Sequence, residues 1–137
     1  MLTWREEFAT GSVLVDTQHR LLIEKINKLE QLLTGASPSK TDCDDLVGFL
    51  GNYAAMHFKF EEQCMSRYQC PAHEQNKQAH EVFLGVFSKF KERYLAEGPK
   101  KELLQNLHAT ASHWIQDHIL AVDIKLKPCV VRSEAEQ

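Results

Sequence analysis

A histidine and a glutamate one helical turn apart, His57 and Glu61, lie in the segment HFKFEE and have the chemistry of a metal site. Residues at positions i and i+4 of a helix share one face. The rest of that face is apolar, with members at spacings of three and four: Leu46, Leu50, Tyr53 and Cys64. Burying an imidazole and a carboxylate without a partner is costly. Both groups are metal ligands, so a bound ion would remove that cost.

Three further apolar stripes with helical spacing also carry polar residues. The stripe from Val15 to Leu33 contains His19. The stripe from His73 to Tyr94 contains His73, Asn76 and His80, followed by aromatic residues. The stripe from Leu104 to Val122 contains His118, and Asp123 follows its last residue. A single histidine on such a stripe is usually a hydrogen-bonded core residue. Inward histidines on four stripes, together with two carboxylates, indicate a metal site inside a helical bundle.

The stripes predict four helices that position these residues. We expect them at about Asp16–Leu33, from a cap at Thr41 or Asp42 to about Arg67, from Pro71 to the Gly98-Pro99 break, and from near Lys100 to about Asp123. The turn-forming stretch TGASPSKTD, with Pro38, separates the first two. Short connections favour antiparallel neighbours, so the predicted fold is all-α, an up-down-up-down four-helix bundle.

The two ends of the chain carry no such stripe. Residues 1–11, with Trp4 and Phe8, are predicted to be an extended N-terminal arm that packs its aromatic side chains on the bundle. Lys127-Pro128 is predicted to stop any helical continuation, and the final residues SEAEQ are expected to fray. The expectation is one domain over residues 1–137, with the arm at 1–11, the bundle at about 12–124 and a tail at 125–137.

Composition narrows the class of protein further. A chain of 137 residues is long enough for one domain with a proper core. Its net charge of −3 gives no reason to expect nucleic-acid binding, and no apolar run reaches the length of a membrane span. The first residues, MLTWREEF, lack the basic and apolar regions of a signal peptide. We therefore expect a cytoplasmic protein without a membrane partner, and favour a monomer.

The four cysteines, Cys43, Cys64, Cys70 and Cys129, include no CxxC pair. In the cytoplasm they are expected to be reduced. Cys64 lies on the same stripe as Glu61 and is predicted to act as a small hydrophobic residue. Thiolate ligation by Cys64 is the alternative. Glu62, a quarter turn away from Glu61, is expected to be a solvated acid.

The ligand types restrict the metal. Histidine, aspartate and glutamate without thiolates suit iron, manganese or zinc better than copper(I). Two carboxylates on different helices can bridge one pair of ions, and four histidines then fill the outer positions. The count therefore favours two metals. A mononuclear site of two histidines and one carboxylate needs only three of these residues and is the main competitor.

Three motifs at these positions resemble a known family. VDTQH around His19, HFKFEE at His57–Glu61 and HILAVD at His118–Asp123 resemble the hemerythrin family, specifically its single-domain bacterial form. Trp4 and the segment Gly11–Asp16 also resemble the N-terminal arm of that family, so the resemblance spans nearly the whole chain. It implies a non-haem di-iron centre, two iron ions with a bridging oxo or hydroxo group, that binds dioxygen reversibly.

The resemblance also implies a role for each residue. Glu61 and Asp123 would bridge the two irons. His19 and His57 would hold the iron that keeps an open position for dioxygen, and His80 and His118 would hold the other.

One position departs from the family pattern. The third helix of the family usually carries HxxxH, whose second histidine matches His80 and whose first falls at Asn76. Three interpretations are open. Asn76 would bind the second metal weakly or through water, or His73 would replace it as the ligand. Alternatively, the centre would be altered and would have low affinity for one metal. His73 and His80 are seven residues apart, roughly 10 Å along a helix, which is a long reach for one ion. We therefore favour the first interpretation, with His73 as a surface or capping residue.

The function predicted from these residues is dioxygen binding for carriage, storage or delivery. The alternative is an enzyme, a di-iron peroxidase or a scavenger of nitric oxide or peroxide, which an extra open position at Asn76 would favour. A sensor or scaffold with a purely structural metal is the third possibility. Fold alone does not separate these functions.

Overall fold

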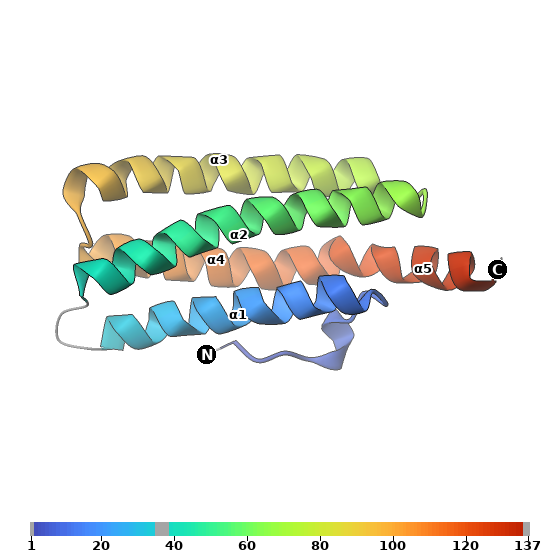
Figure 1. Ribbon diagram of the computed structural model, residues 1–137, viewed down its shortest axis with the longest axis horizontal. Coiled ribbons are helices and arrows are strands. Elements are labelled where there is room, and N and C mark those ends of the chain that lie inside the picture. Colours follow the sequence, from blue (N-terminus) through green and yellow to red (C-terminus); the bar gives the residue numbers. More distant parts are fainter. Residues whose placement is uncertain (1, 35–38, 136–137) are drawn as a thin grey trace.

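The protein is a bundle of four long helices, seen here in a computed structural model that describes residues 2–34 and 39–135. The long helices are α1 (Val13–Thr34), α2 (Lys40–Arg67), α3 (His73–Glu97) and α4 (Lys101–Ala121). They run alternately in opposite directions (Figure 1), and each contacts the next, while α4 closes the bundle against α1. The predicted all-α, up-down-up-down fold is confirmed.

Hydrogen bonds at the start of α1 fix the segment that carries His19. Ser12 Oγ accepts a hydrogen bond from Val15 N at 3.3 Å and so caps the helix. Asp16 Oδ1 accepts two more, from the backbone N and the hydroxyl of Thr10, at 2.9 and 2.8 Å. Gly11, between them, has a φ of +87°, which favours glycine. Because of this cap the helix begins three residues before the predicted Asp16.

The other helix starts differ slightly from the predictions. The N-cap of α2 is Ser39, whose side chain accepts from Asp42 N, so the predicted caps Thr41 and Asp42 lie inside the helix. Pro71 lies in the turn before α3 rather than in its first turn. The predicted turn at residues 35–38, including Pro38, lies outside the described residues.

The interior is divided into two clusters of apolar side chains. The larger one joins leucine, isoleucine and aromatic residues of all four long helices, together with Phe8 of the arm. We call the smaller one the C-terminal core; it contains Val15, Met65, Cys70, Ala72, Leu126, Cys129 and Val130. The polar residues singled out by the sequence lie between these two clusters along the helices.

The N-terminal arm packs on the bundle as predicted. Phe8 is buried, Trp4 meets it edge to face at 5.7 Å, and the Arg20 guanidinium lies over the Trp4 ring. The arm is not wholly extended, because Glu6–Phe8 form a single 3₁₀ turn, η1.

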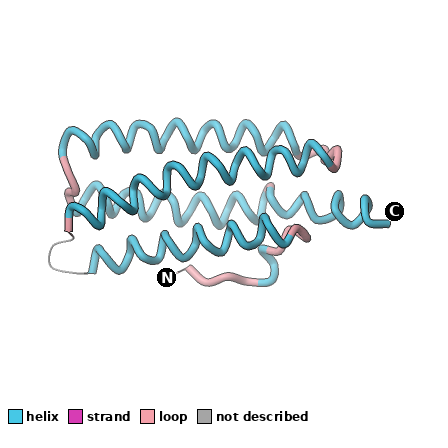
Figure 2. The backbone as a smooth tube through the Cα atoms, viewed as in Figure 1, coloured by secondary structure: helices cyan, strands magenta, loops and turns pink. Residues whose placement is uncertain are grey.

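The prediction that Lys127-Pro128 ends helical structure is wrong. After α4 the chain makes a 3₁₀ turn, η2 (Asp123–Lys125), and continues as a further helix, α5 (Leu126–Ala135). Pro128 is the third residue of α5, where its missing N–H has no intrahelical partner to lose. Residues up to Ala135 are therefore helical rather than frayed, and 136–137 lie outside the described residues. Figure 2 shows α5 extending beyond the bundle.

None of the described helices combines the length and the apolar character that crossing a membrane requires.

Candidate metal centre

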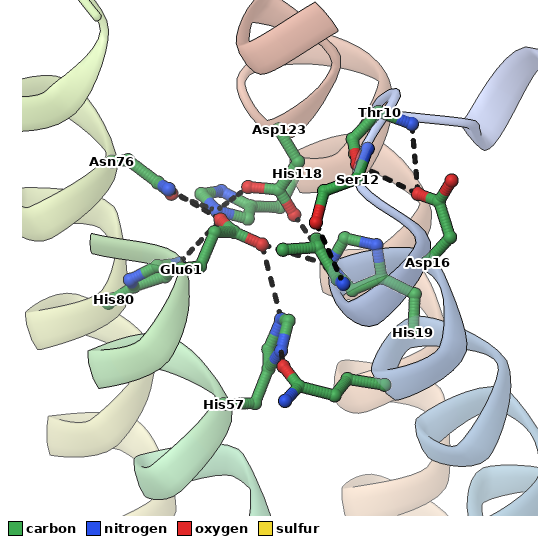
Figure 3. Close-up of polar contacts among 12 residues, drawn as sticks. Thr10, Ser12, Asp16, His19, His57, Glu61, Asn76, His80, His118 and Asp123 are labelled. Atoms are coloured by element: carbon green, nitrogen blue, oxygen red, sulfur yellow. Dashed lines mark hydrogen bonds and ion pairs between the residues drawn. The ribbon is translucent and has the colours of Figure 1, made fainter. Parts of the chain in front are cut away.

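Six ionisable side chains from four helices and one turn face one another between the two apolar clusters (Figure 3). They are His19 of α1, His57 and Glu61 of α2, His80 of α3, His118 of α4 and Asp123 of η2. All are buried, His118 being the most exposed at 6%. So many buried polar groups are costly unless they are paired or bind a metal ion.

Among the described residues, these side chains form two groups that share both carboxylates. The first group is His19, His57, Glu61 and Asp123, and the second is His80, His118, Glu61 and Asp123. Within each group, one potential ligand atom per residue lies within 4.8 Å of the others. Each group is therefore compact enough to hold one metal ion.

The carboxylate oxygens are divided between the two groups. Glu61 Oε2 lies 3.1 Å from His19 Nε2 and 3.2 Å from His57 Nε2, while Oε1 lies 3.5 Å from His80 Nε2. Asp123 Oδ2 lies 3.1 Å from His19 Nε2, and its Oδ1 lies 3.0 Å from His118 Nε2. Each carboxylate thus presents one oxygen to each group, which is the arrangement that bridging two ions requires.

Two residues outside these groups orient the histidines. His57 Nδ1 lies 2.6 Å from Gln18 Oε1, and His80 Nδ1 lies 3.0 Å from Glu62 Oε2. Both oxygens only accept hydrogen bonds, so each Nδ1 carries the proton, and in the neutral ring Nε2 has a lone pair for a metal. Glu62 is therefore not the solvated acid predicted from its position. Gln18 lies beside the apolar stripe of α1, so spacing alone does not predict its role.

Asn76 lies against the second group. Its Nδ2 donates to Glu61 Oε1 at 2.5 Å and to Met65 Sδ at 3.3 Å, and its Oδ1 lies 2.6 Å from His118 Nε2. Asn76 is completely buried, whereas His73 is the half-buried first residue of α3 and belongs to neither group. Of the two residues considered for this position, Asn76 is the one whose side chain meets the metal-binding groups.

The buried charges shift one another's pKa strongly. Burial lowers the pKa of His19, but hydrogen bonds to Asp123 and Glu61 outweigh it and raise that pKa to about 10. Burial would raise the pKa of Glu61, yet hydrogen bonds from Asp123, His19 and His57 hold it well below its usual range. Burial and the neighbouring Glu61 raise the pKa of Asp123. Protons thus supply the positive charge in the metal-free cluster.

The residues present fit a pair of divalent cations. His80 Nε2 is buried and makes no hydrogen bond with any described group, although Glu61 Oε1 lies 3.5 Å away. Buried polar atoms almost always have a partner, and an ion between these two atoms would provide it. The donors are imidazole nitrogens and carboxylate oxygens, which suit iron, manganese or zinc.

An apolar cavity of about 40 Å³ adjoins the two histidines of the first group and the shared Asp123, but neither histidine of the second group. Its polar lining comes from His19, His57 and Asp123, and the remaining lining residues are apolar or aromatic, including Phe58, Phe83 and Trp114. The space suffices for a molecule of a few atoms. Phe58 stacks on the His80 ring at 4.0 Å and Trp114 on the His118 ring at 4.3 Å, so aromatic faces also cover the second group.

Fold and cluster together define a metal-binding four-helix bundle. The family model described as "Hemerythrin HHE cation binding domain" matches residues 10–130. The chain therefore belongs to the hemerythrin family, as its motifs predicted.

Individual relatives agree with this assignment. The chain is 28% identical to a bacteriohemerythrin of Methylococcus capsulatus over 131 residues, covering 95% of this chain and 97% of that one. It is 28% identical to a bacteriohemerythrin of Stenotrophomonas maltophilia over 123 residues, covering 90% and 77%. A crystal structure of wild-type hemerythrin superposes with a TM-score of 0.80 at 26% identity, covering 95% of this chain and 98% of the other.

Metal uptake is expected to release protons and to strengthen as the pH rises. The pKa of about 10 keeps His19 protonated at neutral pH in the metal-free cluster, and a ligand imidazole must be neutral. Below pH 10 protons therefore compete with the metal, and affinity should rise about tenfold per pH unit for each proton displaced. Titration calorimetry between pH 6 and 9, in buffers of different ionisation enthalpy, measures this release. An affinity independent of pH would contradict it.

Proposed function

We propose that this protein binds dioxygen reversibly at a pair of iron ions held between its helices. One observation carries the proposal: two groups of buried ligands share Glu61 and Asp123, and each carboxylate offers one oxygen to each group. Membership of the hemerythrin family supports iron as the metal, since the ligand types alone also suit manganese or zinc.

In this proposal Glu61 and Asp123 would bridge the two ions. His19 and His57 would hold one ion, and His80 and His118 would hold the other. Gln18 and Glu62 hold the rings of His57 and His80 through Nδ1. Such outer hydrogen bonds fix ring orientation and raise the basicity of the ligand nitrogen.

The two ions differ in what lies beside them. The apolar cavity reaches His19 and His57 but neither His80 nor His118, so we place the dioxygen site at the first ion. When bound, the iron pair supplies the electrons that reversible dioxygen binding requires. Phe58, Phe83 and Trp114 keep water away from this position, because an apolar wall offers water no hydrogen bonds.

We propose carriage, storage or delivery of dioxygen as the role, and the cytoplasm as its location. The two relatives described above are named bacteriohemerythrins, which favours the binding function over the peroxidase or scavenger.

An optical experiment tests the proposal. The chain is loaded anaerobically with ferrous iron, expected at two per chain, and spectra are recorded before oxygen, after oxygen and after purging with argon. We expect a charge-transfer band that appears with oxygen and disappears on purging over repeated cycles. Irreversible oxidation on first exposure, or steady consumption of added peroxide with a reductant, would refute reversible binding and favour the enzyme.

A further inference from the structure

Two cysteines far apart in the sequence meet away from the metal ligands. Cys70 lies in the turn between α2 and α3, and Cys129 lies in the first half of α5. Their sulfur atoms are 2.6 Å apart, and both side chains are only 5% exposed. A disulfide is about 2.05 Å long, so little movement separates this pair from a covalent bond.

The surroundings hold the two thiols against each other. Cys70 Sγ and Cys129 Sγ lie 3.4 and 3.5 Å from the same acceptor, the backbone oxygen of Lys125 in η2. Met65 and Leu126 of the C-terminal core are fully buried in the same cluster. Three segments thus meet at the sulfur pair: the α2–α3 turn, η2 and α5.

Two chains of contacts connect this meeting point to the second metal group. Asp123 begins η2, whose last residue, Lys125, faces both sulfurs. Met65, in the same core as the cysteines, accepts a hydrogen bond from Asn76, which itself contacts Glu61 and His118. A bond between the sulfurs would therefore restrain the segment that carries Asp123.

We propose that Cys70 and Cys129 form a reversible dithiol–disulfide couple that fastens η2 and α5 to the α2–α3 turn. The oxidant is hydrogen peroxide, a small molecule suited to a buried pair. One thiolate attacks a peroxide oxygen, the O–O bond breaks, and a sulfenic acid and water are formed after proton transfer. The second thiol attacks the sulfenic sulfur and expels a second water, leaving the disulfide. Two thiols and one peroxide thus give one disulfide and two waters.

A reducing compartment would keep the pair as thiols, and oxidation there would be transient. The bond would close a loop between residues 59 positions apart, and closing long loops restricts the unfolded chain most. Oxidation should therefore raise the thermal midpoint by about 10 °C.

Peptide mapping tests the couple directly. The full chain is treated with one equivalent of hydrogen peroxide, remaining thiols are alkylated, and tryptic peptides are identified by mass spectrometry. We expect the Cys70 and Cys129 peptides to be joined within one chain, and dithiothreitol to separate them. Unfolding followed by circular dichroism should show the rise in midpoint for the oxidised chain.

Serine variants provide the controls. Cys70→Ser and Cys129→Ser should each lose both the joined peptides and the rise in midpoint, whereas the double variant Cys43→Ser/Cys64→Ser should keep both. Full alkylation of Cys70 and Cys129 after peroxide would overturn the proposal. So would disulfides between chains, or oxidation of the two sulfurs to acids that dithiothreitol does not reverse.

Discussion

Replacing Glu61 with alanine is expected to lower the metal content from two ions per chain to one or none. Glu61 Oε2 faces His19 and His57, and Oε1 faces His80, so the substitution removes a ligand from both groups at once. Metal analysis after loading and desalting measures the ratio. Retention of two ions per chain would refute the bridging role.

The neighbouring carboxylate provides a matched control. Glu62 contacts His80 through Nδ1, the ring nitrogen that faces away from Glu61. Glu62→Ala should therefore keep two ions, with the second held about 10- to 100-fold more weakly, as is typical when an orienting hydrogen bond is lost. If the two alanine variants lose metal equally, Glu61 has no special position between the groups.

Loss of Glu61 should also weaken the metal-free fold. The carboxylate is completely buried and pairs with buried histidines, and removing one partner of such a pair typically costs about 3–5 kcal/mol. Glu61→Gln keeps the volume and folds more readily, so it separates metal loss from unfolding. It too should fail to hold two ions, because a neutral amide is a poor bridge.

The helices and the inward histidines could be predicted because both depend on spacing. Apolar residues at intervals of three and four determine which face of a helix is buried, so a histidine within that stripe must point inward. His19, His57, Glu61 and His118 all lie within such stripes, and all four side chains are buried.

The partners of the histidines could not be predicted in this way. Gln18 and Glu62 lie beside the apolar stripes, and their long side chains reach across to rings on neighbouring helices. Periodicity gives the direction of a Cα–Cβ bond, but not how far a flexible side chain extends from the edge of an interface.

The C-terminal helix was missed for a different physical reason. Proline usually ends a helix, but it is tolerated in the first turn, where backbone N–H groups have no intrahelical partner. Pro128 is the third residue of α5, and the 3₁₀ turn at Asp123–Lys125 restarts the helix just before it. The sequence alone does not reveal where a helix restarts.

Replacing Asn76 with histidine is expected to slow loss of the second metal and to slow oxidation in air. The Asn76 amide contacts Glu61 Oε1 and His118 Nε2, two of the atoms that would bind the second ion. An imidazole at this position would add a ligand to that ion, whereas the amide competes for its donors. Met65, whose sulfur lies 3.3 Å from the amide nitrogen, is flexible enough to make room for the ring.

Two rates and one control variant decide this prediction. Release of metal to an excess of chelator should be about tenfold slower in Asn76→His than in the unmodified chain. A tenfold slower release corresponds to an activation free energy of dissociation that is higher by about 1.4 kcal/mol. The optical spectrum of the oxygenated protein should also disappear more slowly in air in Asn76→His than in the unmodified chain. Asn76→Ala removes the competing amide without adding a ligand. If it matches Asn76→His in both rates, the benefit comes from removing the amide, and position 76 supplies no ligand to the second ion.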